Sequence, residues 1–143
     1  MLVSQMLKNR RRQVVDIERH RPIRDAARLM AEHDIGALLV REGERTCGIL
    51  SERDIARGVA RRGMRLADTP VEALMTPDVV TCAPGDDSDD LMRVMTEHNI
   101  RHLPVEVGGR LVGMVSIRNI VQARLAELER DRTALRDYVA GTT

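Results

Sequence analysis

The sequence predicts an α+β fold made of two tandem β-α-β-β-α motifs followed by a C-terminal helix. The first observation is a duplication: residues 31–55 and 96–120 align without a gap at an offset of 65, and 11 of these 25 positions are identical. The second is that short apolar runs alternate in both copies with apolar residues at helical spacing. Because a solenoid needs at least about three units, the duplication indicates a pair of motifs closing on itself.

Each copy is expected to open with a strand and a helix. Residues 14–17 (VVDI) and 79–82 (VVTC) are rich in β-branched residues and resemble short strands, and each run is followed by a polar turn that ends at Pro22 or contains Pro84. Ser88 or Asp87 is the expected N-cap of the second copy's helix. Apolar residues at helical spacing then predict the two helices: Ile23, Ala26, Ala27 and Met30 in the first copy, and Leu91, Val94 or Met95, and His98 in the second.

A hairpin and a second helix complete each copy. Two pairs of apolar runs flank Gly-containing turns, which is typical of β-hairpins: 37–40 with 47–50, and 103–105 with 111–115. Pro104 has no N–H to donate, so it should lie at a strand start or a sheet edge. Ser51 and Asp54 form a predicted capping box that opens the helix of the first copy, and Ser116 opens the corresponding helix.

The expected organisation is a motif at residues 1–65, a second motif at 66–125 and a helical extension at 126–143. Residues 63–70 are expected to link the two motifs. In the last helix Val121, Leu128 and Leu135 stand seven residues apart, a stripe too short to establish a coiled coil. We expect that helix to pack on the domain or on a second subunit.

Composition limits the class of protein. The 143 residues are 43% apolar and 31% charged, as in soluble globular proteins, and no apolar run approaches the roughly 20 residues that cross a bilayer. The N-terminus lacks the pattern of a secretory signal. Cys47 and Cys82 are far apart and in no metal-binding spacing, so a reducing, cytoplasmic setting without membrane attachment is expected.

Charge is unevenly distributed along the chain. Residues 1–70 carry 15 Lys and Arg against 10 Asp and Glu, a net of +5, and residues 71–143 carry 8 against 12, a net of −4. A basic half can attract nucleic acid. Tyr138 is the only aromatic residue, however, so single-stranded bases have nothing to stack on, and nucleic acid is not an expected partner.

Both copies resemble CBS motifs, the units first named in cystathionine β-synthase. The resemblance lies in Gly48–Asp54 (GILSERD) of the first copy and in Arg101–Val105 (RHLPV) and Gly113–Asn119 (GMVSIRN) of the second. Leu74-Met75-Thr76 resembles the usual opening of a second motif. The resemblance covers about residues 3–125, and the pair resembles a stand-alone Bateman module.

The resemblance implies two motifs packed with pseudo-twofold symmetry around two equivalent clefts. Such clefts bind adenosyl ligands, here AMP, ADP, ATP, NAD(H) or S-adenosylmethionine, and such modules pair into flat homodimers. It also implies an energy-sensing regulator of a separate, unidentified protein, with no catalytic cofactor. The sequence contains no nucleophile–base pair, metal-ligand cluster or Gly-rich phosphate loop, so an enzyme is not expected.

Ligand-binding residues follow from the resemblance by position. Asp54 matches the family's ribose-binding acid, since a carboxylate can accept from both ribose hydroxyls. Ser51 lies where helix amides and the dipole favour a phosphate, although both residues could simply cap the helix. Thr76 and Val80 match positions that contact the adenine.

The second copy departs from the family pattern. Asn119 takes the place of the acid beside Ser116, and an amide offers one acceptor and one donor, so we expect a weaker second site. Arg101 and His102 match a phosphate-binding position but could equally be surface residues at a strand start. Arg53 and Arg118 are weaker phosphate candidates.

One alternative from another class stays open. Decayed clefts would leave a ligand-free interaction module that acts through its dimer surface and C-terminal helix. Asn119 and the unmatched region near Lys8 favour it, and the intact Ser51, Asp54 and Thr76 oppose it.

Overall fold

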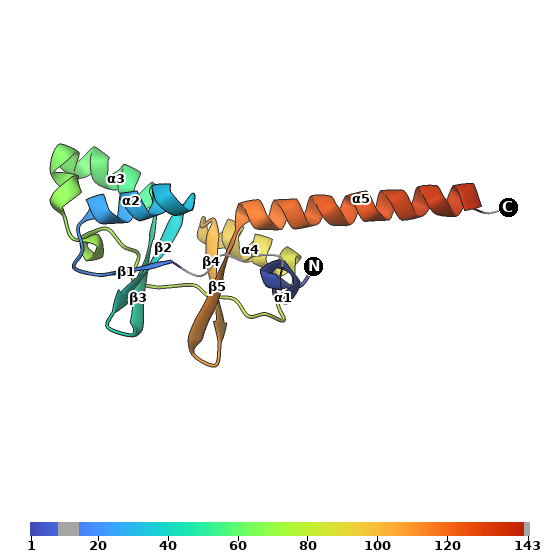
Figure 1. Ribbon diagram of the computed structural model, residues 1–143, viewed down its shortest axis with the longest axis horizontal. Helices are drawn as coiled ribbons and strands as arrows, with labels where there is room; N and C mark the ends of the chain where they lie inside the picture. The colour runs from blue at the N-terminus through green and yellow to red at the C-terminus, as the bar shows by residue number, and fades with distance from the viewer. Residues whose placement is uncertain (9–14, 142–143) are drawn as a thin grey trace. The chain divides into compact units, whose positions relative to one another are not determined.

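The computed structural model describes residues 1–8 and 15–141 and divides them into two compact units, shown in Figure 1. The first unit comprises residues 15–80, and the second comprises residues 1–8 together with 81–141. Each unit therefore combines one copy of the repeat with the short segment that precedes the other copy in the chain.

The first unit has the predicted β-α-β-β-α order. β1 pairs parallel with β2, β2 pairs antiparallel with β3, and the sheet order is β1-β2-β3. Residues 63–70, expected as a linker, contain the 3-10 helix η1, and the 3-10 helix η2 follows them; Leu66 of η1 and Val71 of η2 are buried in the unit. The elements are β1 (Asp16–Glu18), α2 (Ile23–His33), β2 (Ala37–Glu42), β3 (Arg45–Ser51), α3 (Glu52–Arg62), η1 (Gly63–Asp68) and η2 (Val71–Ala73).

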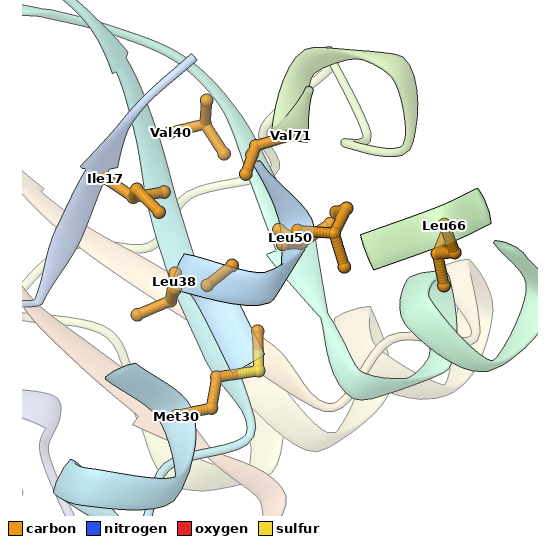
Figure 2. Packing of buried hydrophobic residues seen from close by; sticks show 9 residues of the cluster. Ile17, Met30, Leu38, Val40, Leu50, Leu66 and Val71 are labelled. Atoms are coloured by element: carbon orange, nitrogen blue, oxygen red, sulfur yellow. The ribbon is translucent and has the colours of Figure 1, made fainter. Parts of the chain in front are cut away.

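The core of the first unit joins the sheet to α2. Figure 2 shows Ile17, Leu38 and Leu50, one from each strand, within one apolar cluster. The helical spacing predicted for α2 is confirmed for Ile23, Ala26 and Met30, which are buried, whereas Ala27, also expected on this face, is exposed. Burial of this single face fixes α2 against the sheet. Because β3 is an edge strand, the β3–α3 junction lies at the edge of the sheet.

The second unit repeats this plan with one difference. The predicted strand at 79–82 is wrong: only an isolated parallel bridge joins Cys82 to Val105. As expected from the sequence, Asp87 caps α4 and accepts from the Asp89 N–H at 3.3 Å. The elements are α1 (Val3–Lys8), α4 (Ser88–His98), β4 (His102–Val107), β5 (Arg110–Ser116) and α5 (Ile117–Gly141), with β4 and β5 antiparallel.

Pro104 explains the missing strand. In the first unit Leu39 donates its N–H to the Val15 carbonyl at 3.3 Å. Pro104 stands at the corresponding position and has no N–H, so this ladder bond cannot form. Pairing begins only where Cys82 donates to the Pro104 carbonyl at 2.9 Å. The expectation that Pro104 lies at a sheet edge is thus confirmed.

In each unit a glycine in the last strand of the hairpin allows a neighbouring segment to approach the strand closely. A Cβ at Gly48 would stand 2.6 Å from Met75 Sδ, and a Cβ at Gly113 would stand 2.6 Å from Leu7 Cδ2. Met75 belongs to the segment between the copies and Leu7 to α1. Glycine at both positions lets a strand accept the segment that precedes the other copy.

α5 is the longest helix, with 25 residues, and it passes α1 and α4 of its own unit in Figure 1. Its buried residues are Ile120 and Ala123, near the start. In the described ranges, 1–8 and 15–141, no helix combines the length and the apolar character that a membrane span requires.

Candidate functional site

The candidate site of the first unit lies where β3 ends and α3 begins. Ser51 is the N-cap, in extended conformation, and its Oγ accepts from the Asp54 N–H at 3.2 Å. In return Asp54 Oδ2 accepts from the Ser51 N–H at 2.9 Å and from the Ser51 hydroxyl at 3.1 Å. The predicted capping box is confirmed, and both side chains are half-buried.

This cap uses only one oxygen of the carboxylate. Both Ser51 donors converge on Oδ2, and no donor within the described part of the chain reaches Asp54 Oδ1. A carboxylate has about four lone-pair positions, so Oδ1 can still accept hydrogen bonds from hydroxyl groups. Asp54 therefore caps α3 and offers an acceptor at the same time.

The second unit reproduces the cap with an amide. Ser116 donates to Asn119 Oδ1 from its N–H at 2.9 Å and from its hydroxyl at 2.7 Å, and Asn119 N–H donates to Ser116 Oγ at 3.2 Å. A backbone N–H can only donate, so the Asn119 atom facing it is the oxygen. The one amide acceptor is thus occupied, and the group that remains is a donor.

Two N–H groups in the first turn of each helix are bonded within their own unit. Glu52 N–H donates to the Gly36 carbonyl at 3.0 Å, and Ile117 N–H donates to the Arg101 carbonyl at 2.8 Å. Together with the serine caps, these bonds occupy two of the amides that a helix N-terminus offers to an anion. The Ser51 hydroxyl, expected near a phosphate, points its proton at Asp54 instead. Sequence reasoning did not identify the two carbonyl contacts, since any residue type can provide them.

Two arginines and a histidine accompany the amide in the second unit. His102 pairs with Ser116 in the β4–β5 ladder, and Arg101 directly precedes β4 with an exposed side chain. Arg118 is the second residue of α5 and is also exposed. In the first unit the positions of Arg101 and His102 are Gly36 and Ala37, and Arg53 is the half-buried counterpart of Arg118.

Thr76 lies beside the Ser51–Asp54 box. Its N–H donates to the Ile49 carbonyl at 2.8 Å, and its carbonyl accepts from the Ile49 N–H at 3.0 Å. Ile49 precedes Ser51 by two residues in β3, so the structure brings Thr76 to the same strand end. Its side chain is exposed, which leaves the hydroxyl as its available polar group. Val80 is half-buried at the C-terminal end of the unit.

Two surface hollows are lined by other residues. One lies along β1 and α2, and the other lies at the repeat-related place in the second unit. The first contains the ion pairs Arg41–Asp16 and Arg21–Asp25, each at 3.1 Å, and its lining also includes Glu18 and Arg28. The second is lined by Thr81, Cys82, Asp86, Asp90, Leu91, Arg93, Val94, Glu97 and Leu103.

The two units, each with a capped helix after its hairpin, define a protein with a duplicated CBS fold. The CBS domain model matches residues 4–61 and 71–126, and the chain belongs to the CBS domain family. The predicted resemblance and fold class are thereby confirmed.

Known structures have the same fold. A CBS-domain protein from Burkholderia ambifaria is 40% identical, with a TM-score of 0.84 over 88% of this chain and 95% of that one. PAE2072 from Pyrobaculum aerophilum, determined in complex with AMP, is 31% identical, with a TM-score of 0.74 over 91% and 99% of the two chains.

Curated relatives extend beyond the matched region. A 17.7 kDa protein of Acidianus ambivalens is 38% identical over 105 residues, which are 72% of this chain and 62% of that protein. The chain spans about three fifths of the length of the first curated relatives that it matches.

Proposed function

We propose that this protein is a regulatory module that binds an adenosyl ligand through Asp54 and thereby modulates a separate protein. The observation that carries the proposal is the geometry of Asp54, whose Oδ2 caps α3 while Oδ1 remains able to accept. AMP in the PAE2072 complex, from a relative 31% identical, supports an adenosyl ligand. The expected ligands are AMP, ADP, ATP, NAD(H) and S-adenosylmethionine.

Ribose is the part of these ligands that suits Asp54. Two neighbouring hydroxyls need acceptors, and Oδ1 has two lone pairs to offer. The Thr76 hydroxyl, brought to the same strand end by the Ile49 pairing, is the candidate contact for the adenine, and Val80 is the candidate apolar contact. Ser51 acts by orienting the carboxylate, and Arg53 is a candidate for the phosphates.

The second unit would bind the same ligand differently. Asn119 offers a donor where Asp54 offers an acceptor, so a ribose would receive a hydrogen bond there and could not donate to the amide oxygen. Arg101, His102 and Arg118 instead suit an anionic group. We therefore propose two unequal sites, with the tighter one at Asp54.

Regulation requires that the ligand favour one conformation over another, because equal binding to both shifts nothing. We propose that the protein acts as a homodimer and that the ligand changes its affinity for an unidentified partner protein in the cytoplasm. In this proposal the protein itself is not an enzyme.

A ligand-free interaction module is the second candidate. The observation that favours it is the closure of both helix N-termini, where Gly36 and Arg101 carbonyls and the serine caps already occupy amides that could bind phosphate. Its dimer surface and C-terminal helix would then carry the function.

Calorimetric titration of protein freed of carried-over ligand distinguishes the ligand-binding module from the ligand-free interaction module. AMP, ADP, ATP, NAD, NADH and S-adenosylmethionine would be compared on wild type, Asp54→Asn and the control Glu44→Gln in the β2–β3 turn. Asn119 shows that an amide supports the same cap, so Asp54→Asn should fold normally and weaken binding at least tenfold. Unchanged binding in Asp54→Asn would place the ligand elsewhere, and no binding of any compound at millimolar concentration would favour the interaction module.

A further inference from the structure

The far half of α5 exposes an apolar stripe that its own unit does not cover. Every side chain from residue 128 to residue 141 is exposed, including Leu128 at 56%, Leu135 at 65% and Val139 at 67%. Isolated helices shorter than roughly 12–15 residues are marginal in water. The far half of α5 receives no packing from its own unit, so a partner along the apolar face would stabilise it.

The exposed apolar positions follow a heptad pattern. Val121, Leu128 and Leu135 are seven apart, and Leu125 and Val139 fall four residues after the first and the third. These are d and a positions, respectively, and the remaining a position is Arg132. We call the six residues the α5 seam: Val121, Leu125, Leu128, Arg132, Leu135 and Val139. The seam runs over roughly 27 Å of helix at 1.5 Å per residue.

The seam points away from the unit that carries it. The inward face of α5 is defined by Ile120 and Ala123, which are buried, and by the half-buried Glu127. At about 100° per residue the centre of the seam lies roughly 130° around the helix from the centre of that inward face. The expectation that α5 packs on its own domain therefore holds only for its first turns.

Charges beside the seam indicate what covers it. In a parallel pair of identical helices, a g residue faces the e residue five positions later in the partner. Arg124 would then face Glu129 of the second copy, and Asp131 would face Arg136. Both pairs are attractive. Arg124 already contacts Glu127 at 3.3 Å and Asp89 at 3.6 Å in its own unit, whereas Asp131 and Arg136 form no ion pair within the described residues and are the pair most available to a second copy.

The antiparallel arrangement places like charges together. The register that overlaps the whole seam sets Leu125 against Leu135 of the other copy. It then sets Glu129 against the partner copy's Glu129, and Asp131 against the partner copy's Asp131. Like charges across a seam disfavour that arrangement, so the charge pattern selects the parallel one.

Arg132 is compatible with a two-stranded parallel seam. A single polar residue at an a position lowers stability but fixes register and oligomeric state. In the parallel register the Arg132 side chains lie near Asp131 of the opposite copy, which supplies a counter-charge at the edge of the seam.

We propose that α5 forms a parallel two-stranded coiled coil with α5 of a second copy of this chain through the α5 seam. This interaction is independent of ligand binding at Asp54. It would hold two copies with their α5 helices side by side, whether or not other surfaces also meet.

Cysteine cross-linking of the full chain tests both the contact and its direction. Arg132→Cys places a thiol in the seam at an a position, where parallel helices bring the same residue of two chains together. Ala126→Cys, on the outer face of α5, is the matched control, and wild type shows any background from Cys47 and Cys82. We expect Arg132→Cys to form a disulfide-linked dimer under mild oxidation at least tenfold faster than Ala126→Cys.

A second set of variants keeps the proposal falsifiable if the cysteine alters packing. Leu128→Glu with Leu135→Glu should raise the dimer dissociation constant at least tenfold in sedimentation and abolish the Arg132→Cys cross-link, whereas Ala126→Glu with Ala134→Glu should do neither. Circular dichroism confirms that each variant is folded. Equal cross-linking at 126 and 132, or an unaffected cross-link in the seam variant, would overturn the proposal. Cross-linking only between Arg132→Cys and Leu128→Cys chains would overturn the parallel arrangement.

Discussion

Ser116 donates two hydrogen bonds to the side-chain oxygen of Asn119, from its N–H at 2.9 Å and its hydroxyl at 2.7 Å. Ser51 makes the same pair of contacts to Asp54 Oδ2, at 2.9 Å and 3.1 Å. The two copies of the repeat thus cap their helices identically and differ in the one side-chain atom that the cap does not use. That atom is an oxygen in Asp54 and an NH₂ nitrogen in Asn119.

Asn119→Asp should convert the second unit into a copy of the first. The new carboxylate keeps one oxygen for Ser116 and provides the other as an acceptor, so ribose affinity at the second site should rise several-fold. Calorimetric titration with the ligand that binds wild type most tightly measures this change. The variant should show a higher stoichiometry or a lower dissociation constant for the second binding event. An unchanged second phase in Asn119→Asp, with a normal first phase, would mean that another residue limits that site.

Removing either serine cap should destabilise the fold by a similar amount. Each variant removes a serine hydroxyl that accepts from the N–H of residue 54 or 119 and donates to the side chain of the same residue. The variants are Ser51→Ala and Ser116→Ala. We expect each to lower the free energy of unfolding by about 1 kcal/mol. Urea unfolding measures this, with Ser4→Ala as the comparison, since Ser4 is also half-buried but its side chain makes no cap of this kind. A loss in one variant only would show that the two caps are not energetically equivalent.

The two cysteines should differ in reactivity toward alkylating reagents. Burial, with a further contribution from Asp86, raises the pKa of Cys82 to about 11. The thiolate is the reactive form, and at pH 8 only roughly a thousandth of Cys82 is thiolate, so its alkylation should be slow. Cys47 is half-buried and should be alkylated first. Peptide mass spectrometry after timed iodoacetamide treatment reads both sites; faster labelling of Cys82 would contradict the packing described for the second unit.

The repeat was sufficient to predict the elements because its apolar spacing is local. Ile23, Ala26 and Met30 face the core as expected, and the Ser51–Asp54 box forms at the predicted helix start. The strand expected at 79–82 failed because of Pro104, whose missing N–H acts on a segment more than 20 residues away in sequence. β-propensity in the segment itself does not reveal the lost donor.

The candidate site was predictable in residue type and only partly in geometry. Side-chain type identified Asp54 as an acceptor and Asn119 as a departure from it. The partners that occupy the helix amides are the backbone carbonyls of Gly36 and Arg101, and the partner of Thr76 is the backbone of Ile49. Contacts made by backbone groups leave no signature in residue type, so only the folded chain reveals them.

Gly48 and Gly113 should tolerate a methyl group unequally. A Cβ at Gly48 would meet Met75 Sδ at 2.6 Å and also the Thr76 carbonyl oxygen at 2.9 Å, whereas the three atoms nearest to a Cβ at Gly113 all belong to the flexible side chain of Leu7. A flexible side chain can move away, but the Thr76 carbonyl is fixed by its pairing with Ile49.

Gly48→Ala should therefore lower the free energy of unfolding by roughly 1–3 kcal/mol, more than Gly113→Ala does. Gly85→Ala is the control, since a Cβ there meets nothing within 4 Å. Urea unfolding measures the free energy of unfolding of the three variants and so ranks their stability. Because the displaced carbonyl belongs to Thr76, Gly48→Ala should also weaken ligand binding when Thr76 contacts the adenine. Equal loss of stability in Gly48→Ala and Gly113→Ala would show that the Thr76 strand yields as easily as the Leu7 side chain.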